Sequence, residues 1–599
     1  MSRATKCLWS SLVLGLAAGD AAGQSTTRVS VSSTGVEADN GSGWVSISMH
    51  GRFVAFQYSA TNLVAGDTNS CDDVFVHDRQ GGTTERVNVS SAGAQASNEC
   101  TSPSISADGR FVSFTSFAAN LVSGDTNSTF DVFVRDRQSG TTERVSLGSA
   151  GAQANAGCFG SGISADGRFV LFGSPASNLV AGDTNNDYDV FVRDRLNGTT
   201  EIVSVSTSGV QANSFCTRCS ISPDGRFVGF DSAASNLVAG DTNNDFDIFV
   251  RDRQNGTTER MSIDSAGAQG NDYSYWATIS TDGRFVSFQS FATNLVAGDT
   301  NASADVFVRD RQAGTTERVS LTSAGAQANG PCYLPSISAD GRHVQFEGAA
   351  TNLVPGDSNG CVDVFARDLQ SGTTERVSVD SAGAEGHGDT WYNCLPSISE
   401  EGRYVAFVSF AGNLVAGDTN GFLDVFVRDR GTTGPGTDVC QAGTGGVIAC
   451  PCSNPPGSSP RGCDNSSATG GAQLTSSGAA SLASDSLVFV TNGEKPVAAS
   501  VVLQGNAEVA NGLAFGQGVR CVGGGLKRLY VKAASGGSIT APGGGDPSVS
   551  TRSAALGDAI AAGTSRWYAV SFRDPIVLGG CPATAVFNVT QTQRVNWGP

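Results

Sequence analysis

Seven copies of one segment occupy the first 430 residues, and this repeat constrains the fold more than any other feature of the sequence. Each copy contains Ile-Ser-x-Asp-Gly-Arg-Phe-Val-x-Phe or a close variant, and five of the six steps between copies are 58 residues, the last being 61. Self-similarity with such a period indicates a propeller, a solenoid or an array. The copies begin at Ile47, Ile105, Ile163, Ile221, Ile279, Ile337 and Ile398.

Each copy contains four runs typical of β-strands. In the second copy they are residues 103–106, 111–116, 131–135 and 142–147, with tight-turn pairs at Asp108-Gly109 and Ser139-Gly140. Runs such as 132–134 are apolar on both faces, as expected of strands covered by a sheet on either side. Four strands per repeat, without helical periodicity, predict an all-β chain built from β-propeller blades.

The strand count predicts how the ring closes. One fourth-strand run, at residues 26–29, precedes the first marker, whereas the seventh copy has no fourth strand of its own. We therefore expect a seven-bladed β-propeller over residues 24–432, closed by the N-terminal strand. An open array would leave two sheet edges exposed to aggregation.

The repeat resembles the WD40-like propeller repeat of the TolB type. The resemblance rests on Ile-Ser-Ala-Asp-Gly-Arg-Phe-Val followed by Asp-Val-Phe-Val-Arg-Asp, and it covers about residues 24–432. It implies a propeller fold but no single activity, because binding proteins, lyases and peptidases share this scaffold. TolB itself has six blades and a preceding α/β domain, and the sequence predicts neither.

The N-terminal residues predict export. Arg3 and Lys6 precede an apolar run at residues 7–18 and a small-residue stretch ending at Gly23, the order found in secretory signal peptides. The alternative is a membrane anchor, although the run is short for a span. We assign residues 1–23 as a signal peptide and expect a secreted, periplasmic or cell-surface protein without a membrane span after processing.

Composition changes after the repeats. Residues 433–470 form a cysteine-rich neck containing Cys440, Cys450, Cys452 and Cys463, and residues 471–599 contain further strand-like runs. We predict a small C-terminal antiparallel β-sandwich-like domain. It resembles a module attached to exported bacterial repeat proteins, on motifs such as Gly-Val-Arg-Cys-Val-Gly-Gly. Disulfides are favoured for the neck over zinc, because the usual Cys-x₂₋₄-Cys spacing is absent.

Cysteines in the repeats suggest further disulfides, since export places the chain in an oxidising compartment. Cys71 and Cys361 share one repeat position, and each is followed by a cysteine in the next inter-blade loop. This pattern predicts the bridges Cys71–Cys100 and Cys361–Cys394, with Cys216–Cys219 as a third pair and Cys158 and Cys332 unbridged.

An acidic loop, Gly-Asp-x-Asn-x-x-x-Asp, precedes each third strand. It resembles the first half of an EF-hand loop, and calcium is the one cofactor that the sequence suggests. The alternative is that Asp and Asn cap their own turn. The best calcium candidates are Asp183, Asn185, Asp187 and Asp189 in the third copy and Asp241, Asn243, Asp245 and Asp247 in the fourth.

Aromatic residues vary between copies where the scaffold does not. They fall in the loops before the first strands, which we expect on one propeller face around the channel mouth, where aromatic rings suit sugar stacking or peptide anchoring. Alternatively, they plug the channel or pack against the C-terminal domain. These residues are Trp44, Phe159, Phe215, Tyr273, Tyr275, Trp276, Tyr333, Trp391 and Tyr392.

The sequence offers little for catalysis. No Gly-x-Ser-x-Gly is present, and three of the four histidines replace other residues within the repeat. A net charge of −18 argues against nucleic acid as a partner. We therefore predict a non-catalytic binding module for a glycan or protein at the aromatic loop face. The alternatives are a lyase-like carbohydrate-active propeller and a structural or adhesive surface protein.

Overall fold

The computed structural model divides the chain into two compact units, residues 1–431 and 432–599. It describes residues 24–431 except 42, 391–395 and 400–401. In the second unit it describes residues 436–597 except 441–449, 451–461, 464–470, 478–479, 481–484, 486, 496, 516, 536, 544, 562–563 and 575–585. The predicted signal peptide and most of the predicted neck lie outside the described residues.

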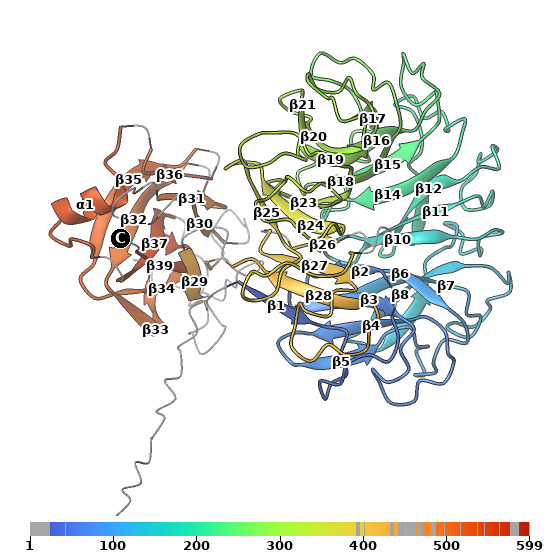
Figure 1. The fold of residues 1–599 in the computed structure, drawn as a ribbon, viewed down its shortest axis with the longest axis horizontal. Coiled ribbons are helices and arrows are strands. Elements are labelled where there is room, and N and C mark those ends of the chain that lie inside the picture. The colour runs from blue at the N-terminus through green and yellow to red at the C-terminus, as the bar shows by residue number, and fades with distance from the viewer. Residues whose placement is uncertain are drawn as a thin grey trace, which may run out of the picture. The chain divides into compact units, whose positions relative to one another are not determined.

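The first unit consists of four-stranded antiparallel sheets, one per repeat (Figure 1). The first two are β2 (Val45–Ile47), β3 (Phe53–Tyr58), β4 (Asp73–Asp78), β5 (Thr83–Arg86), and β6 (Cys100–Ile105), β7 (Phe111–Ser116), β8 (Asp131–Asp136), β9 (Thr141–Arg144). The next two are β10 (Phe159–Ile163), β11 (Phe169–Ser174), β12 (Asp189–Asp194), β13 (Thr199–Ile202), and β14 (Cys216–Ile221), β15 (Phe227–Ser232), β16 (Asp247–Asp252), β17 (Thr257–Arg260). Two more are β18 (Ser274–Ile279), β19 (Phe285–Ser290), β20 (Asp305–Asp310), β21 (Thr315–Arg318), and β22 (Cys332–Ile337), β23 (His343–Gly348), β24 (Asp363–Asp368), β25 (Thr373–Arg376). The last combines β26 (Ser397–Ile398), β27 (Tyr404–Ser409) and β28 (Asp424–Asp429) with β1 (Ser25–Arg28).

Apolar residues on both faces of the middle strands hold neighbouring sheets together. In β8 the residues Val132, Phe133 and Val134 are all fully buried, because adjacent sheets cover both faces. Phe133 stacks on Phe114 of β7 within its own sheet, with ring centroids 5.8 Å apart. The prediction of an all-β chain is confirmed, with one short helix in the described residues.

The first and last repeats are in direct contact. β1 pairs with β28 along its whole length, and Figure 1 shows the blue strand beside the orange one. The backbone N–H of Ile47 donates to the Ser397 hydroxyl over 3.1 Å. Tyr404 lies against Gly51, as Phe53 lies against Gly109 one repeat further along. The N-terminal strand therefore supplies the fourth strand that the seventh repeat lacks.

The predicted propeller disulfides are wrong. Cys100 and Cys216 share one repeat position at the start of the first strand, with Cys158 and Cys332, and all four are buried free thiols. The Cys100 thiol donates to the Ser116 hydroxyl over 3.1 Å, and burial raises its pKa to about 12. These cysteines are core residues of the repeat, and the serine at residue 274 takes the same place in the fifth copy.

The remaining candidate cysteines are also unbridged in the described residues. Cys71 and Cys361 are free thiols that donate to the carbonyls of residues two positions earlier. Cys219 is free as well, so the pair Cys216–Cys219 is not formed. Cys394, the proposed partner of Cys361, lies outside the described residues.

The second unit is built from antiparallel sheets. Its six-stranded sheet contains β29 (Gly436–Cys440), β39 (Thr592–Asn596), β37 (Ser565–Arg573), β32 (Ala499–Gly505) and β35 (Lys527–Ala533), with β38 (Phe587–Val589) on β37. A three-stranded sheet contains β30 (Gln473–Ser477), β31 (Val488–Asn492) and β36 (Thr540–Ala541), and β33 (Ala507–Phe515) pairs with β34 (Gly518–Gly523). The helix α1 (Val549–Ala555) has seven residues. No helix in the described part of the chain has the length and hydropathy of a membrane span.

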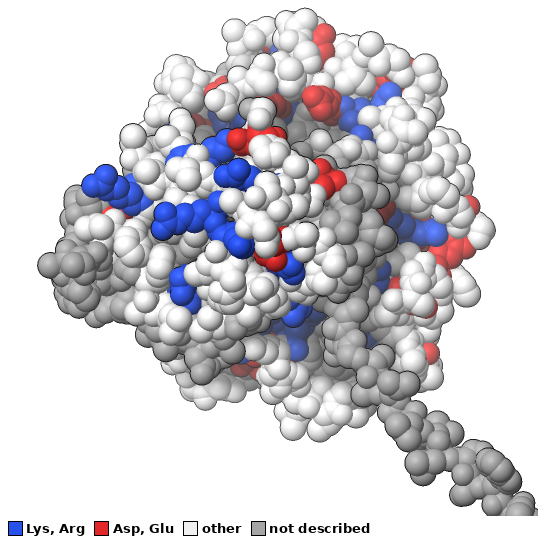
Figure 2. All heavy atoms as spheres, turned by 90° about the vertical axis from the view of Figure 1, so that its left-hand side faces the viewer, with Lys and Arg blue, Asp and Glu red and all other residues white. Residues whose placement is uncertain are grey.

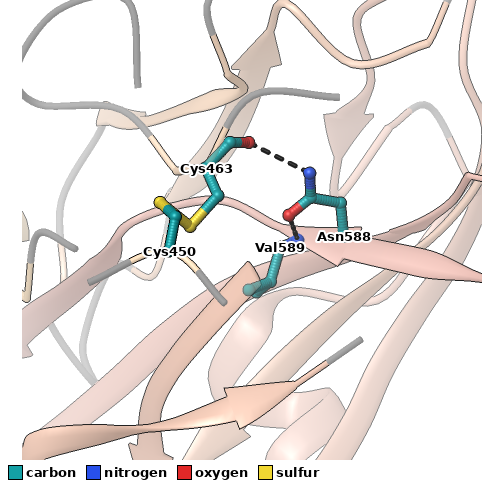
Figure 3. Close-up of a disulfide and its surroundings, with 4 residues drawn as sticks. All are labelled: Cys450, Cys463, Asn588 and Val589. Atoms are coloured by element: carbon teal, nitrogen blue, oxygen red, sulfur yellow. Dashed lines mark hydrogen bonds between the residues drawn. A yellow bond between two sulfur atoms is a disulfide. The ribbon is translucent and has the colours of Figure 1, made fainter. Parts of the chain in front are cut away.

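Apolar packing and disulfide bonding brace this unit. Phe489 of β31 contacts Tyr568 of β37, with centroids 4.6 Å apart, so the two larger sheets share a core. Cys450 is bonded to Cys463, whose carbonyl accepts a hydrogen bond from the Asn588 side chain over 3.0 Å (Figure 3).

Residues 432–599 carry ten Lys and Arg against eight Asp and Glu, and Figure 2 shows basic side chains gathered within a mostly uncharged surface. The acidity of the chain therefore resides in the repeats.

Candidate functional site

A cavity of about 780 Å³ occupies the centre of the first unit. The first strand of every sheet contributes to it, because these are the innermost strands of the propeller. The repeat marker places one isoleucine from each copy on the cavity wall: Ile47, Ile105, Ile163, Ile221, Ile279, Ile337 and Ile398. The wall is therefore largely apolar and repeats from sheet to sheet.

One position in the first strand breaks this regularity. Strands β6, β10, β14, β18 and β22 each contain a β-bulge, where the register with the second strand shifts. The backbone there is left-handed in several copies, with φ of +53° at Ser102 and +60° at Trp276. Bulges re-aim side chains, and left-handed backbone at a bulky residue is strained. Spaced 58 residues apart, Trp44, Ser102, Gly160, Arg218 and Trp276 occupy this position and line the cavity.

Arg218 is the only charged residue among the described residues that line the cavity. Its guanidinium lies over the Trp276 ring, 4.1 Å from the centroid, and it forms no ion pair or side-chain hydrogen bond with any residue that the structure describes. Trp276 in turn contacts Trp44, with centroids 6.5 Å apart. These residues come from the fourth, fifth and first repeats, so their side chains meet in the central channel.

A buried carboxylate lies next to Arg218. Asp231 of β15 is fully buried and accepts hydrogen bonds from the Thr217 hydroxyl over 2.7 Å and from the backbone N–H of Arg218 over 2.8 Å. Burial raises the pKa of Asp231 to about 7. The carboxylate therefore fixes the bulge backbone; the nearby Arg218 charge acts against the rise of its pKa, and no hydrogen bond joins the two side chains in the described structure.

Of the nine predicted aromatic residues, the structure describes seven. Trp44, Phe159, Phe215 and Trp276 line the cavity. Tyr275 and Tyr273 belong to a ring cluster around Phe246, 5.0 Å from Tyr275, and Phe215 of the cavity wall joins the same cluster, 5.1 Å from Phe246. Tyr333 lies in β22 outside the cavity lining, and Trp391 and Tyr392 lie outside the described residues.

Sequence reasoning missed Arg218 and Tyr188, both of which line the cavity. The signal that could have pointed to Arg218 is its position within the repeat. Aligning the seven copies puts Trp, Ser, Gly, Arg, Trp, Leu and Leu at residues 44, 102, 160, 218, 276, 334 and 395, so this position and its neighbours vary whereas the marker that follows is nearly constant.

The two predicted calcium loops differ in the structure. In the fourth repeat Arg260 lies between the carboxylates of Asp241 and Asp247, at 3.4 and 3.3 Å. In the third repeat the residue equivalent to Arg260 is Ile202. The amide oxygens of Asn185 and Asn243 accept the backbone N–H groups of Asp187 and Asp245, as the turn-capping alternative requires. No group of three or more His, Cys, Asp and Glu side chains with metal-site geometry occurs in the described residues.

Comparisons with known proteins bear on the fold. No protein-family model and no curated protein matches the chain. A solved structure of putative TolB from Agrobacterium tumefaciens is 17% identical, covering 49% of this chain and 83% of that one, with a TM-score of 0.30. The β-propeller domain of the Trilobed protease from Pyrococcus furiosus is 12% identical, covering 64% and 94%, with a TM-score of 0.40. Acylaminoacyl peptidase from Pyrococcus horikoshii is 12% identical, covering 61% and 48%, with a TM-score of 0.37.

The predicted function is corrected by these findings. Proteins of similar structure include peptidases as well as TolB, so a non-catalytic binding module does not follow from the propeller. The same finding applies to the predicted glycan or protein ligand at the aromatic loop face, which the propeller alone does not support. In fold, the chain is similar to TolB-type and other β-propeller proteins.

Proposed function

We propose that the central channel binds a small organic ligand that combines a flat apolar part with one carboxylate. The observation that carries this proposal is the guanidinium of Arg218, which has no ion pair with a described residue, in a cavity wall whose other described residues are uncharged. Ligand cavities of 300–1,000 Å³ with apolar walls and a few polar groups are typical of small-molecule sites. A volume of about 780 Å³ lies within that range.

Arg218 has the chemistry for a carboxylate. A guanidinium presents a planar fork of N–H donors that matches the two oxygens of a carboxylate. Stacking on Trp276 restrains its plane while leaving the N–H edge unoccupied. Every arginine of the repeated Asp-Gly-Arg motif, by contrast, is paired with an aspartate, as Arg226 is with Asp252 at 2.6 Å. Arg218 is thus available to bind a ligand, whereas the arginines of the Asp-Gly-Arg motif are not.

The aromatic residues supply the apolar part of the site. Trp44 and Trp276 contact each other across the channel, and Phe159, Tyr188 and Phe215 line the same cavity. A planar ring can stack against such side chains in an offset arrangement. The seven copies share one scaffold, so confining an arginine and two tryptophans to three copies makes an otherwise symmetric channel asymmetric.

Ligand titration tests the proposal. A set of aromatic carboxylic acids and their neutral amides is screened by ligand-observed NMR, and hits are measured by calorimetry. Losing a charge-assisted hydrogen bond costs about 1.5–3 kcal/mol, so Arg218→Ala should weaken acid binding by about 10- to 150-fold and leave the amides unchanged. Arg110→Ala, which removes an arginine paired with Asp136 outside the channel, is the control. Equal binding of acids by Arg218→Ala and the wild type would overturn the proposal.

We also propose export of the chain, on its N-terminal residues 1–23 alone. Their charge, apolar run and small-residue end have the order of a secretory signal peptide. N-terminal sequencing of the protein recovered outside the cytoplasm should begin at Gln24. Retention of the full N-terminus in the cytoplasm would contradict this assignment.

A further inference from the structure

Each repeat pairs two carboxylates behind its acidic loop, and in six repeats an arginine from the fourth strand neutralises them. In the fourth repeat the Nη1 atom of Arg260 lies 3.4 Å from Asp241 and 3.3 Å from Asp247, and its Nη2 atom donates to the Gly240 carbonyl over 3.3 Å. The equivalent arginines, each within 3.6 Å of both carboxylates, are Arg28, Arg86, Arg144, Arg260, Arg318 and Arg376.

The third repeat has the carboxylates without the arginine. Ile202 takes its place and packs against the apolar cluster between the second and third sheets. Asp183 and Asp189 remain together, because the Gln211 amide donates to both, over 2.7 and 2.8 Å. This amide is neutral, so it holds the two acids together without balancing their charge.

Two observations indicate an unfilled place for a cation. Asp189 is fully buried, and the Oδ2 atom of Asp183 is buried without a hydrogen-bond partner in the described structure. The Gly182 carbonyl also lacks the arginine donor that its counterpart Gly240 receives. Buried charge is costly unless it is paired or coordinates a metal. Three oxygen-bearing groups whose counterparts contact the guanidinium in the fourth repeat therefore have no cationic partner among the described residues of the third repeat.

We propose that the third repeat binds one calcium ion through the carboxylates of Asp183 and Asp189 and the carbonyl of Gly182. Calcium takes carboxylate and carbonyl oxygens in irregular arrangements and completes its shell with water, whereas magnesium demands near-octahedral geometry. With two carboxylates, the site should have a Kd on the order of 10⁻⁴–10⁻³ M, the range of extracellular calcium modules. In the third repeat the ion would supply the positive charge that a fourth-strand arginine supplies in the other six repeats.

The repeats supply matched variants for the test. Equilibrium dialysis with radioactive calcium, on protein freed of metal by a chelator, counts the bound ions directly. We expect one ion per chain for the wild type and for the control Ile202→Leu, and none for Ile202→Arg, which restores the arginine of the other repeats. Arg260→Ile should add a second ion by exposing Asp241 and Asp247.

The outcomes separate the possibilities. Uptake that survives in Ile202→Arg would overturn the proposal, as would the absence of uptake by the wild type at 10-fold the expected Kd. The latter result would mean that a shared proton neutralises the two acids. Circular dichroism verifies that Arg260→Ile is folded; if it is not, Ile202→Arg against Ile202→Leu decides the question alone.

Discussion

Replacing His343 with phenylalanine should make the protein more resistant to acid. His343 stands where other repeats carry Phe or Tyr, it is 1% exposed, and its Nδ1 atom has no hydrogen-bond partner in the described structure. Burial, followed by the nearby Arg430 charge, lowers the pKa of His343 from 6.5 to about 3. The folded protein therefore keeps this ring neutral under conditions in which the unfolded chain protonates it.

The size of the effect follows from linkage. The pKa of His343 is lower in the folded protein than in the unfolded chain. The free energy of unfolding is therefore unaffected by this residue well above pH 6.5 and decreases as the pH falls from 6.5 toward 3. Each pH unit in that window costs about 1.4 kcal/mol, so the wild type should lose about 2 kcal/mol between pH 6.5 and pH 5 through this residue. Phenylalanine does not titrate, so His343→Phe should avoid that loss.

Urea unfolding at pH 8 and pH 5 measures the difference. The free energy of unfolding of His343→Phe relative to the wild type should rise by about 2 kcal/mol between pH 8 and pH 5. Replacement of the exposed His387 by glutamine serves as the control for loss of a histidine outside the core. A difference between His343→Phe and the wild type that is the same at both pH values would refute the reasoning.

Three further predictions concern the scaffold. Gly225→Ala should cost about 2–5 kcal/mol, since φ is +72° and the new Cβ would lie 2.2 Å from the preceding repeat's phenylalanine; a Tm within a degree of wild type would contradict this. The pKa of Asp231 is raised from 3.8 to about 7, so its stabilising effect should fade as pH rises between those values, by at most about 4 kcal/mol, and Asp231→Asn should flatten the Tm–pH profile there. Non-reducing peptide mapping should recover Cys450 joined to Cys463 and Cys100 as a thiol; a bridged Cys100 would refute its role as a core residue.

The fold was predictable because its signals are local and repeated. Turn pairs such as Asp108-Gly109 and the doubly apolar run around Phe133 define strands without reference to the rest of the chain. The candidate site was not, because its residues act across repeats. Arg218 meets Trp276 from the next blade, and only alignment of the copies brings out their shared bulge position.

The misread residues have a common physical origin. Cys100 was paired by loop proximity, although its repeat position points into the core and favours any small side chain that can bond to Ser116. The residues of the acidic loops alone do not distinguish them, because the arginine that does so comes from the fourth strand of the repeat, as Arg260 does for Asp241. Short-range patterns carry no information about such counter-charges.

The most direct test of the proposed channel site is a crystal structure of the protein soaked with the tightest aromatic carboxylate from the NMR screen. We predict electron density inside the central cavity, with the carboxylate on the N–H edge of Arg218 and the ring against Trp44 or Trp276. A ligand bound outside the channel, or one inside it with its carboxylate turned away from Arg218, would contradict the proposed function.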